Sequence, residues 1–194
     1  MFTGIIKKTG LIKKIENLKK GKKILVKSPL KLNKKNDMGA SISCSGVCLT
    51  IEKIEKKYIS FYLSNETLRL SNFKNLKLNQ IINLEQSLKF GDRISGHFVQ
   101  GHIDDVCKLK DKKIVGKSWH LYFSLNKKLK KFLVKKSSIA INGVSLTIAK
   151  IFNNGFLIVV IPHTLRLTNL KYIKKNDILN VEIDIFAKYI KNLK

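Results

Sequence analysis

Apolar and polar side chains alternate along two matching stretches of this chain. In INGVSLTIA, which starts at Ile141, one face of an extended strand carries Val144, Leu146 and Ile148, and the other carries Gly143, Ser145 and Thr147. In GVCLTI, which starts at Gly46, an aliphatic face likewise lies opposite Gly46, Cys48 and Thr50. The aliphatic faces predict a packed core. The polar face suits a solvated strand, but its occurrence in two places favours a wall that contacts a ligand.

Other short apolar stretches extend this pattern. The predicted strands cover residues 40–51, 58–64, 80–84, 138–150, 155–161 and 177–183. Turn-forming breaks such as Lys20-Gly21-Lys22 and Asn153-Asn154-Gly155 lie between strands. Several short strands at this spacing predict an all-β fold, a small closed barrel or a sandwich.

Helical segments are predicted at three places. ETLRLSNF, residues 66–73, and HTLRLTNL, residues 163–170, predict short helical turns that close each barrel. The tail IFAKYIKNLK predicts a short C-terminal helix with one apolar stripe. The stripe consists of Ile185, Phe186, Tyr189, Ile190 and Leu193.

The chain is internally repeated with a spacing of 97 residues. NETLRLSN, Asn65 to Asn72, returns as PHTLRLTN, Pro162 to Asn169. The register holds without a gap from Gly46 to Glu85, with 18 identities over 40 positions, and Gly4 matches Gly101. Two copies are too few for a solenoid. The chain is therefore predicted to hold two tandem domains, residues 1–97 and 98–184, followed by the helix of residues 185–194.

Composition narrows the class of protein. Hydrophobic residues make up 44% of the 194 residues, which suffices for a packed core. No apolar run approaches the roughly 20 residues of a membrane helix, and the N-terminus lacks a secretory pattern. Three cysteines form no even disulfide framework. These features predict a cytoplasmic protein without a membrane partner.

The net charge of +26 raises the possibility of nucleic-acid binding. However, 36 of the 39 basic residues are lysines spread over the whole chain; the arginines are Arg69, Arg93 and Arg166. Base readers favour the forked guanidinium of Arg, and no aromatic platform for single strands is evident. The lysines therefore indicate compositional drift, and any nucleic-acid binding should be salt-sensitive and blind to sequence.

The segment GDRISGHFVQGHIDD, residues 91–105, places two imidazoles near glycines where the copies join. Zinc is not predicted, because there is no C-x-x-C and the four histidines lack ligand spacing. A histidine near its ordinary pKa of about 6.5 is a proton carrier at neutral pH. His102 is the candidate for that role, and a structural role for it is the alternative.

Five motifs in order resemble the single-chain (alpha-type) riboflavin synthase family: MFTGI, GVCLT, SGHFVQGHID, NGVSLT and IPHTLRLTNL. The resemblance runs from Met1 to about Ile185. It implies two six-stranded Greek-key β-barrels and a C-terminal helix, assembled as a homotrimer. It also implies a transferase that dismutates two molecules of 6,7-dimethyl-8-ribityllumazine. One lumazine gives four carbons to the other, yielding riboflavin and 5-amino-6-ribitylaminouracil with no cofactor or metal.

The resemblance implies that each barrel binds one lumazine. The active site would form where the N-terminal barrel of one subunit meets the C-terminal barrel of another. The implied substrate-binding residues are Phe2, Thr3, Gly4, Ile5, Ile6, Cys48, Leu49, Thr50, Tyr62, Leu63, Ser64, Asn65, Glu66, Thr67, Gly101, His102, Ile103, Lys136, Ser145, Leu146, Thr147, Ile161, Pro162, His163, Thr164, Leu165 and Arg166.

A dismutase must treat its two substrates differently. Equivalent positions that carry different residues in the two copies are therefore the first candidates for catalytic roles. These are Cys48/Ser145, Glu66/His163, Ile5/His102, Ser87/Asp184 and Gly39/Lys136. His102, or a water it polarises, is the predicted base for the donor's C7 methyl. Ser145, assisted by Asp184, is the predicted nucleophile at C7 of the acceptor, with water as the alternative. Cys48, with an unperturbed pKa of about 8.5 and so mostly thiol at neutral pH, is predicted to bind rather than attack.

Two departures and one further alternative complete the hypothesis. Asn142 stands where many family members have Asp, and the tail after Asp184 is only ten residues long. A shorter tail weakens the expectation of a trimer, because that helix builds the trimer core in the family. The main alternative is a non-catalytic relative that binds lumazine or flavin. Such a relative would hold one lumazine per chain, and the enzyme two.

Overall fold

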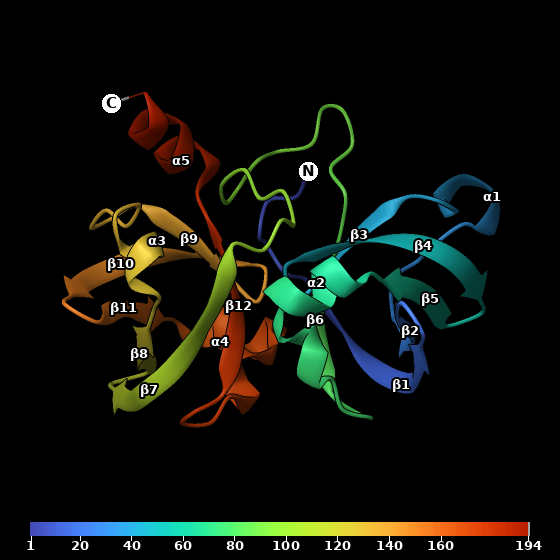
Figure 1. Ribbon diagram of the computed structural model, residues 1–194, viewed down its shortest axis with the longest axis horizontal. Helices are drawn as coiled ribbons and strands as arrows, with labels where there is room; N and C mark the ends of the chain where they lie inside the picture. The colour runs from blue at the N-terminus through green and yellow to red at the C-terminus, as the bar shows by residue number, and fades with distance from the viewer. Residues whose placement is uncertain (194) are drawn as a thin grey trace.

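Two closed antiparallel barrels of six strands each stand side by side in the computed structural model, which describes residues 1–193 (Figure 1). The first has the strand order β1-β2-β5-β4-β3-β6, and the second has the equivalent order β7-β8-β11-β10-β9-β12 around its closed circle. In each barrel the second and third strands are not neighbours, which gives the Greek-key connection. The predicted all-β fold with two duplicated barrels is confirmed.

The N-terminal barrel consists of β1 (Lys8–Leu18), β2 (Gly21–Lys27), α1 (Lys34–Asp37), β3 (Ser41–Cys44), β4 (Val47–Glu55), β5 (Tyr58–Leu63), α2 (Asn65–Leu70), the 3-10 turn η1 (Asn72–Asn75) and β6 (Ile81–Gln86). The C-terminal barrel consists of β7 (Asp105–Val115), β8 (Ser118–Ser124), α3 (Lys127–Lys130), β9 (Ser138–Ile141), β10 (Val144–Phe152), β11 (Gly155–Val160), α4 (Pro162–Leu167), η2 (Asn169–Tyr172) and β12 (Ile178–Ile183). The helix α5 (Ile185–Asn192) follows.

The predicted strands 40–51 and 138–150 are wrong in one respect, because each is a hairpin of two strands. Cys44 pairs with Val47, and Ile141 pairs with Val144, so a two-residue turn separates the strands. Both turn residues have positive φ, 45° and 86° at Ser45-Gly46 and 46° and 75° at Asn142-Gly143. These angles match a type I′ turn, which favours Asn-Gly. The other four predicted strands are confirmed to within two residues, whereas β1, β2, β7 and β8 were not predicted.

The helical predictions are confirmed, except that the C-terminal helix, predicted over residues 185–194, ends at Asn192, and residue 194 lies outside the described residues. ETLRLSNF and HTLRLTNL form α2 with η1 and α4 with η2. The Ser64 hydroxyl caps α2 by accepting the Thr67 N–H, and Pro162 begins α4. In α5 the stripe residues Phe186, Tyr189 and Ile190 are exposed, 56%, 65% and 60% respectively. None of the helices described for residues 1–193 is long and apolar enough to cross a membrane.

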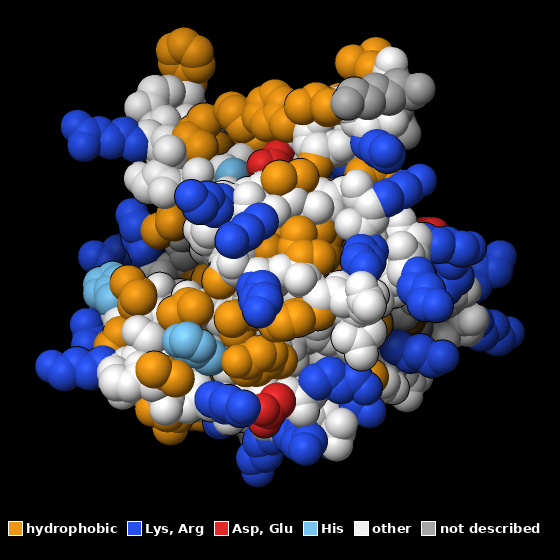
Figure 2. Space-filling view, turned by 90° about the vertical axis from the view of Figure 1, so that its left-hand side faces the viewer, with side chains coloured by type: hydrophobic (Ala, Val, Ile, Leu, Met, Phe, Trp, Pro, Cys, Tyr) orange, Lys and Arg blue, Asp and Glu red, His pale blue; other side chains and the backbone are white. Residues whose placement is uncertain are grey.

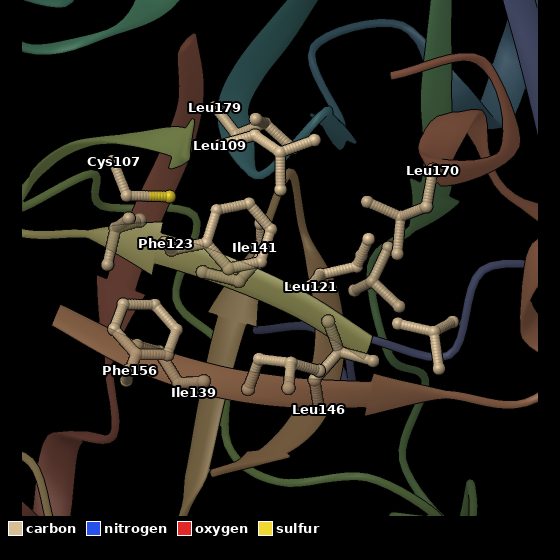
Figure 3. Packing of buried hydrophobic residues seen from close by; sticks show 14 of the residues in the cluster. Cys107, Leu109, Leu121, Phe123, Ile139, Ile141, Leu146, Phe156, Leu170 and Leu179 are labelled. Carbon is tan, nitrogen blue, oxygen red and sulfur yellow. The ribbon is translucent and has the colours of Figure 1, made fainter. Parts of the chain in front are cut away.

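Each barrel has its own hydrophobic core. One residue from the first repeat packs in the C-terminal core, and one residue from the second repeat packs against the N-terminal core. The aliphatic face of β10 is buried in the C-terminal core, where Leu146 belongs to the same cluster as Leu121, Phe123 and Phe156 (Figure 3). Ile6, from the N-terminal copy, belongs to this same core and is 4% exposed. Ile103, from the C-terminal copy, packs against the N-terminal core. The segments that begin the two copies are therefore exchanged between the barrels.

Equivalent residues of the two copies meet where the barrels join. Phe2 and Val99, 97 residues apart, exchange two backbone hydrogen bonds of 2.7 and 3.1 Å. The Asn169 N–H donates to Asn83 Oδ1, and the equivalent Asn72 N–H donates to Asn180 Oδ1, both at 2.7 Å. These reciprocal contacts describe an approximate twofold relation between the barrels.

The surface of the C-terminal barrel shows how the charge is distributed. Lys and Arg side chains are scattered over this face rather than gathered in one stripe (Figure 2). A band of hydrophobic side chains lies along its upper rim, where Figure 1 places α5. Scattered lysines fit the interpretation of the charge as compositional drift.

Candidate functional site

The exchanged segments lie against Cys48 on β4 and Ser145 on β10, where the polar faces of these strands begin. Ser145 on β10 donates its N–H to the Gly4 carbonyl at 2.8 Å, and Cys48 on β4 donates its N–H to the Gly101 carbonyl at 2.9 Å. The two contacts are related by the spacing of 97 residues. Each barrel therefore combines its own nucleophile-type residue with the opening segment of the other copy.

Only glycine fits at the crossing over Cys48. Gly101 has φ +83°, and a Cβ there would lie 2.5 Å from Cys48 Cβ and 2.8 Å from Cys48 N. The obstacle includes backbone, so it cannot be relieved by a side-chain rotation. The contact accounts for the Gly4/Gly101 match in the repeat, because a Cβ added at Gly4 would likewise lie 2.7 Å from Ser145 Cβ.

Ser145 is hydrogen-bonded to a buried histidine. His97 Nδ1 lies 2.7 Å from Ser145 Oγ, and His97 is 8% exposed. Burial lowers the pKa of His97, and the negative charge of Asp184 opposes this effect. A neutral imidazole can accept the serine proton, so the pair has the geometry of an activated nucleophile. His97 Nε2 is buried and has no hydrogen-bond partner among residues 1–193.

His97 was not among the predicted site residues, although it lies close to His102 in the sequence. With a spacing of 97 residues, His97 has no equivalent residue in the first copy, so a comparison of the two copies could not identify it as a site residue. The sequence feature that could have identified it is the Gly96-His97 pair, which resembles Gly101-His102.

His102 lies at the other barrel. Its backbone N–H donates to Glu182 Oε2 at 3.2 Å, and its side chain is exposed. Since Gly101 contacts Cys48 and Ile103 packs on the N-terminal core, His102 lies on the side of Cys48. The structure therefore pairs His97 with Ser145, and the backbone of His102 lies next to the Gly101 that contacts Cys48.

Asp184 follows β12 and begins α5. Its Oδ1 accepts the Phe186 N–H at 3.0 Å, which caps the helix. Its negative charge favours the protonated form of His97, so its link to Ser145 runs through the imidazole.

The helical turns α2 and α4 differ at the repeat break Glu66/His163. In α2 the Glu66 carboxylate forms a bidentate ion pair with Arg69, and this interaction lowers the pKa of Glu66. In α4 the equivalent Arg166 Nη2 lies 3.4 Å from His163 Nδ1. All four side chains are partly or fully exposed. The equivalent arginines therefore face a carboxylate in the first copy and an imidazole in the second.

Lys136 occupies a strained backbone position. Its φ is +72°, close to the +77° of its equivalent, Gly39. A left-handed conformation costs a non-glycine residue about 1–2 kcal/mol. The side chain is exposed, so packing does not explain why lysine replaces glycine here. Such strain is typical of functional positions.

The remaining predicted binding residues fall into two groups. Residues with buried side chains are Phe2, Thr3, Ile6, Leu49, Leu63, Leu146 and Leu165. Side chains that are partly or fully exposed are Ile5, Thr50, Tyr62, Ser64, Asn65, Thr67, Ile103, Thr147, Ile161, Pro162 and Thr164. In the described part of the chain no three His, Cys, Asp or Glu side chains cluster as a metal site would require.

Comparison with known proteins identifies the repeat. The lumazine binding domain family matches the chain twice, at residues 3–87 and 100–184. The riboflavin synthase of Buchnera aphidicola subsp. Baizongia pistaciae (strain Bp) is 36% identical over 97% of this chain and 89% of its own length. That of Photobacterium leiognathi is 36% identical over 100% of this chain and 88% of its own length.

Solved structures share the fold. The crystal structure of LumP complexed with 6,7-dimethyl-8-(1'-D-ribityl) lumazine superposes with a TM-score of 0.84 and 25% identity, over 94% of this chain and 98% of that chain. LumP complexed with riboflavin gives a TM-score of 0.87 at 24% identity, over 94% and 99% of the two chains.

Proposed function

Since the chain belongs to the riboflavin synthase family, whose members are transferases with two lumazine binding domains, we propose that it catalyses the family's dismutation. Two molecules of 6,7-dimethyl-8-ribityllumazine would react by four-carbon transfer, giving riboflavin and 5-amino-6-ribitylaminouracil. The observation that carries the proposal is the exchange of segments, which builds two equivalent sites from different nucleophile-type residues. Residues 1–97 and 98–184 are taken as the two binding units.

Binding would use the segments that meet at each barrel. One lumazine would lie by Cys48, Thr50, residues 62–67 and Gly101 to Ile103. The other would lie by Ser145, Thr147, residues 161–166 and Gly4 to Ile6. Backbone groups of these segments can read the edge of a planar heterocycle, and the two threonine hydroxyls can hold ribityl oxygens. Lys136, held in its strained conformation, is available to a ligand oxygen.

The chemistry would divide between the sites. The C-terminal site is the acceptor site in this proposal: Ser145 Oγ adds to C7 while His97 takes its proton, and Asp184 favours the resulting imidazolium. A water in place of Ser145 is the alternative nucleophile. At the N-terminal site His102, or a water it polarises, removes a proton from the donor's C7 methyl. Cys48, the equivalent of Ser145, would bind the substrate rather than attack it. Alignment of the two substrates can supply about 7–11 kcal/mol of the barrier reduction.

Assembly as a homotrimer remains part of the proposal. Thr50, Thr147, His102 and His163 are partly or fully exposed in the single chain, whereas the reaction benefits from a site closed to water. This exposure supports a site completed by a second chain, the N-terminal barrel of one subunit facing the C-terminal barrel of another. The exposed stripe of α5 supports association, and the three free thiols suit the proposed cytoplasmic location.

The test is incubation with 6,7-dimethyl-8-ribityllumazine alone. One riboflavin formed per two lumazines consumed would support the dismutase. Binding of one lumazine per chain without turnover would instead support a non-catalytic relative. Variants then assign the roles: Ser145→Ala, Asp184→Ala, His97→Gln and His102→Gln, with His120→Gln on β8 as a histidine control. Loss of a general base should lower turnover by about 10²–10⁴-fold. Turnover within a few-fold of wild type in both Ser145→Ala and Asp184→Ala would overturn the nucleophile assignment.

A further inference from the structure

Glu182 on β12 is a buried carboxylate whose hydrogen bonds all go to one short backbone segment. Its Oε1 accepts the Gln100 N–H at 2.6 Å, and its Oε2 accepts the N–H groups of Gly101 at 2.8 Å and His102 at 3.2 Å. The residue is 2% exposed. A carboxylate this deeply buried is retained only if its oxygens are well bonded.

The equivalent Glu85 on β6 holds the opening segment of the first copy. Its Oε1 accepts the Thr3 N–H at 2.8 Å and the Thr3 hydroxyl at 2.7 Å, and its Oε2 accepts the Gly4 N–H at 3.0 Å. The next N–H, of Ile5, donates to the Thr3 hydroxyl at 3.2 Å. The two clamps are alike in design, but Glu85 also holds the hydroxyl of Thr3.

Each clamp acts across the junction of the barrels. Glu182 belongs to the C-terminal barrel, but the segment that it binds lies on the N-terminal barrel, where the Gly101 carbonyl accepts the Cys48 N–H. Glu85 belongs to the N-terminal barrel, and its segment lies on Ser145. The carboxylate of one barrel thus fixes the backbone that completes the polar face of the other.

We propose that Glu182 and Glu85 are positioning residues, each of which sets the ligand-binding segment of the opposite barrel. Glu182 positions residues 101–103 against Cys48, and Glu85 positions residues 3–5 against Ser145. The consequence for lumazine binding rests on the function proposed above; the positioning itself does not.

The charged surroundings of Glu182 are Asp104 and Lys188. Lys188 Nζ lies 2.7 Å from Asp104 Oδ2, so these two form an ion pair with each other. Burial raises the pKa of Glu182 to about 7, while its backbone hydrogen bonds and Lys188 lower it. The carboxylate form is the better acceptor for three N–H donors, and it predominates above that pH.

The matched variants Glu182→Gln and Glu85→Gln test the proposal with Cys48 as a probe. Both keep the side-chain shape and replace one carboxylate oxygen with an amide group that cannot accept. Cys44 and Cys107 are fully buried, so iodoacetamide alkylation mapped by mass spectrometry reports on Cys48. Glu182→Gln should raise the Cys48 alkylation rate roughly tenfold, because charge-assisted hydrogen bonds to the covering segment are lost. Glu85→Gln should leave it within about twofold of wild type. Equal rates in the two variants would overturn the proposal.

Amide exchange of the unmodified protein provides a test that does not depend on a variant folding. The N–H groups of Gln100, Gly101 and His102 should exchange as slowly as those of the barrel strands, and fast exchange would overturn the proposal. Lumazine titration separates the two proposals. Glu182→Gln should weaken binding at one of two sites, whereas a wild-type protein that binds no lumazine would refute the function and leave the alkylation result decisive.

Discussion

The close approach of the two hairpin turns predicts the cost of a single methyl group at the junction. Gly143 has φ +75°, and a Cβ added there would lie 2.6 Å from Gly46 N and 2.9 Å from Gly46 Cα. Gly143→Ala therefore adds a left-handed alanine, at about 1–2 kcal/mol, and forces two backbones apart, at about 1–3 kcal/mol. We expect a loss of about 2–5 kcal/mol in the free energy of unfolding, a large part of the usual 5–15 kcal/mol.

Gly39→Ala separates these two costs. Gly39 has nearly the same φ, +77°, but a Cβ added there would have no atom within 4 Å. This variant should lose only the conformational part, so Gly143→Ala should exceed it by about 1–3 kcal/mol in urea unfolding followed by circular dichroism. Equal losses would refute the contact between Gly143 and Gly46 as a determinant of stability.

Two further predictions concern the exchanged segment and the buried carboxylate. Ile6→Ala should lower the free energy of unfolding by about 2–5 kcal/mol and speed hydrogen exchange of the amides in the C-terminal barrel. The control Ile5→Ala, at a more exposed neighbouring position, should lower it by less than about 0.5 kcal/mol. Equal losses in the two variants would contradict the packing of the N-terminal segment on the C-terminal barrel. Because the pKa of Glu182 in the folded protein, about 7, lies above its ordinary value of 4.5, the native state holds this proton more tightly than the unfolded state. Its contribution to stability should therefore fall between about pH 4.5 and 7, by at most about 1.4 kcal/mol per pH unit, and a wild-type protein that gains stability over this range relative to Glu182→Gln would refute the shift.

The strand faces could be predicted from the sequence because a strand has a period of two. Val144, Leu146 and Ile148 are buried, as expected, and Ser145 and Thr147 face outward. The hairpin turns were missed although Asn142-Gly143 is a strong turn signal, because the apolar pattern continues on both sides of it. The two-residue turn shifts the alternation by one position, because the inward residues change from Ile139 and Ile141 before the turn to Val144 and Leu146 after it, and this change of phase was the overlooked signal.

The exchange of segments could not be predicted from the repeat. The spacing of 97 residues shows that Gly4 and Gly101 are equivalent, but not on which barrel either of them lies. Glu85 and Glu182 are identical between the copies, yet an acidic residue in a strand usually indicates a solvated face. Only the three-dimensional structure shows that both carboxylates turn inward toward backbone N–H groups.

The exchange also changes how the repeat breaks combine into sites. Read along the sequence, His102 belongs with Ser145, and Ile5 with Cys48. In the structure the opposite pairing holds, because residues 4–6 lie on the barrel of Ser145 and residues 101–103 on the barrel of Cys48. His97, buried and bonded to Ser145 Oγ, lies at one of these places, and the exposed His102 follows the Gly101 that contacts Cys48 at the other. The dismutation proposed above would draw its asymmetry from the difference between a serine bonded to a buried imidazole and a cysteine beside the backbone of residues 101–103, and not from a histidine in one barrel alone.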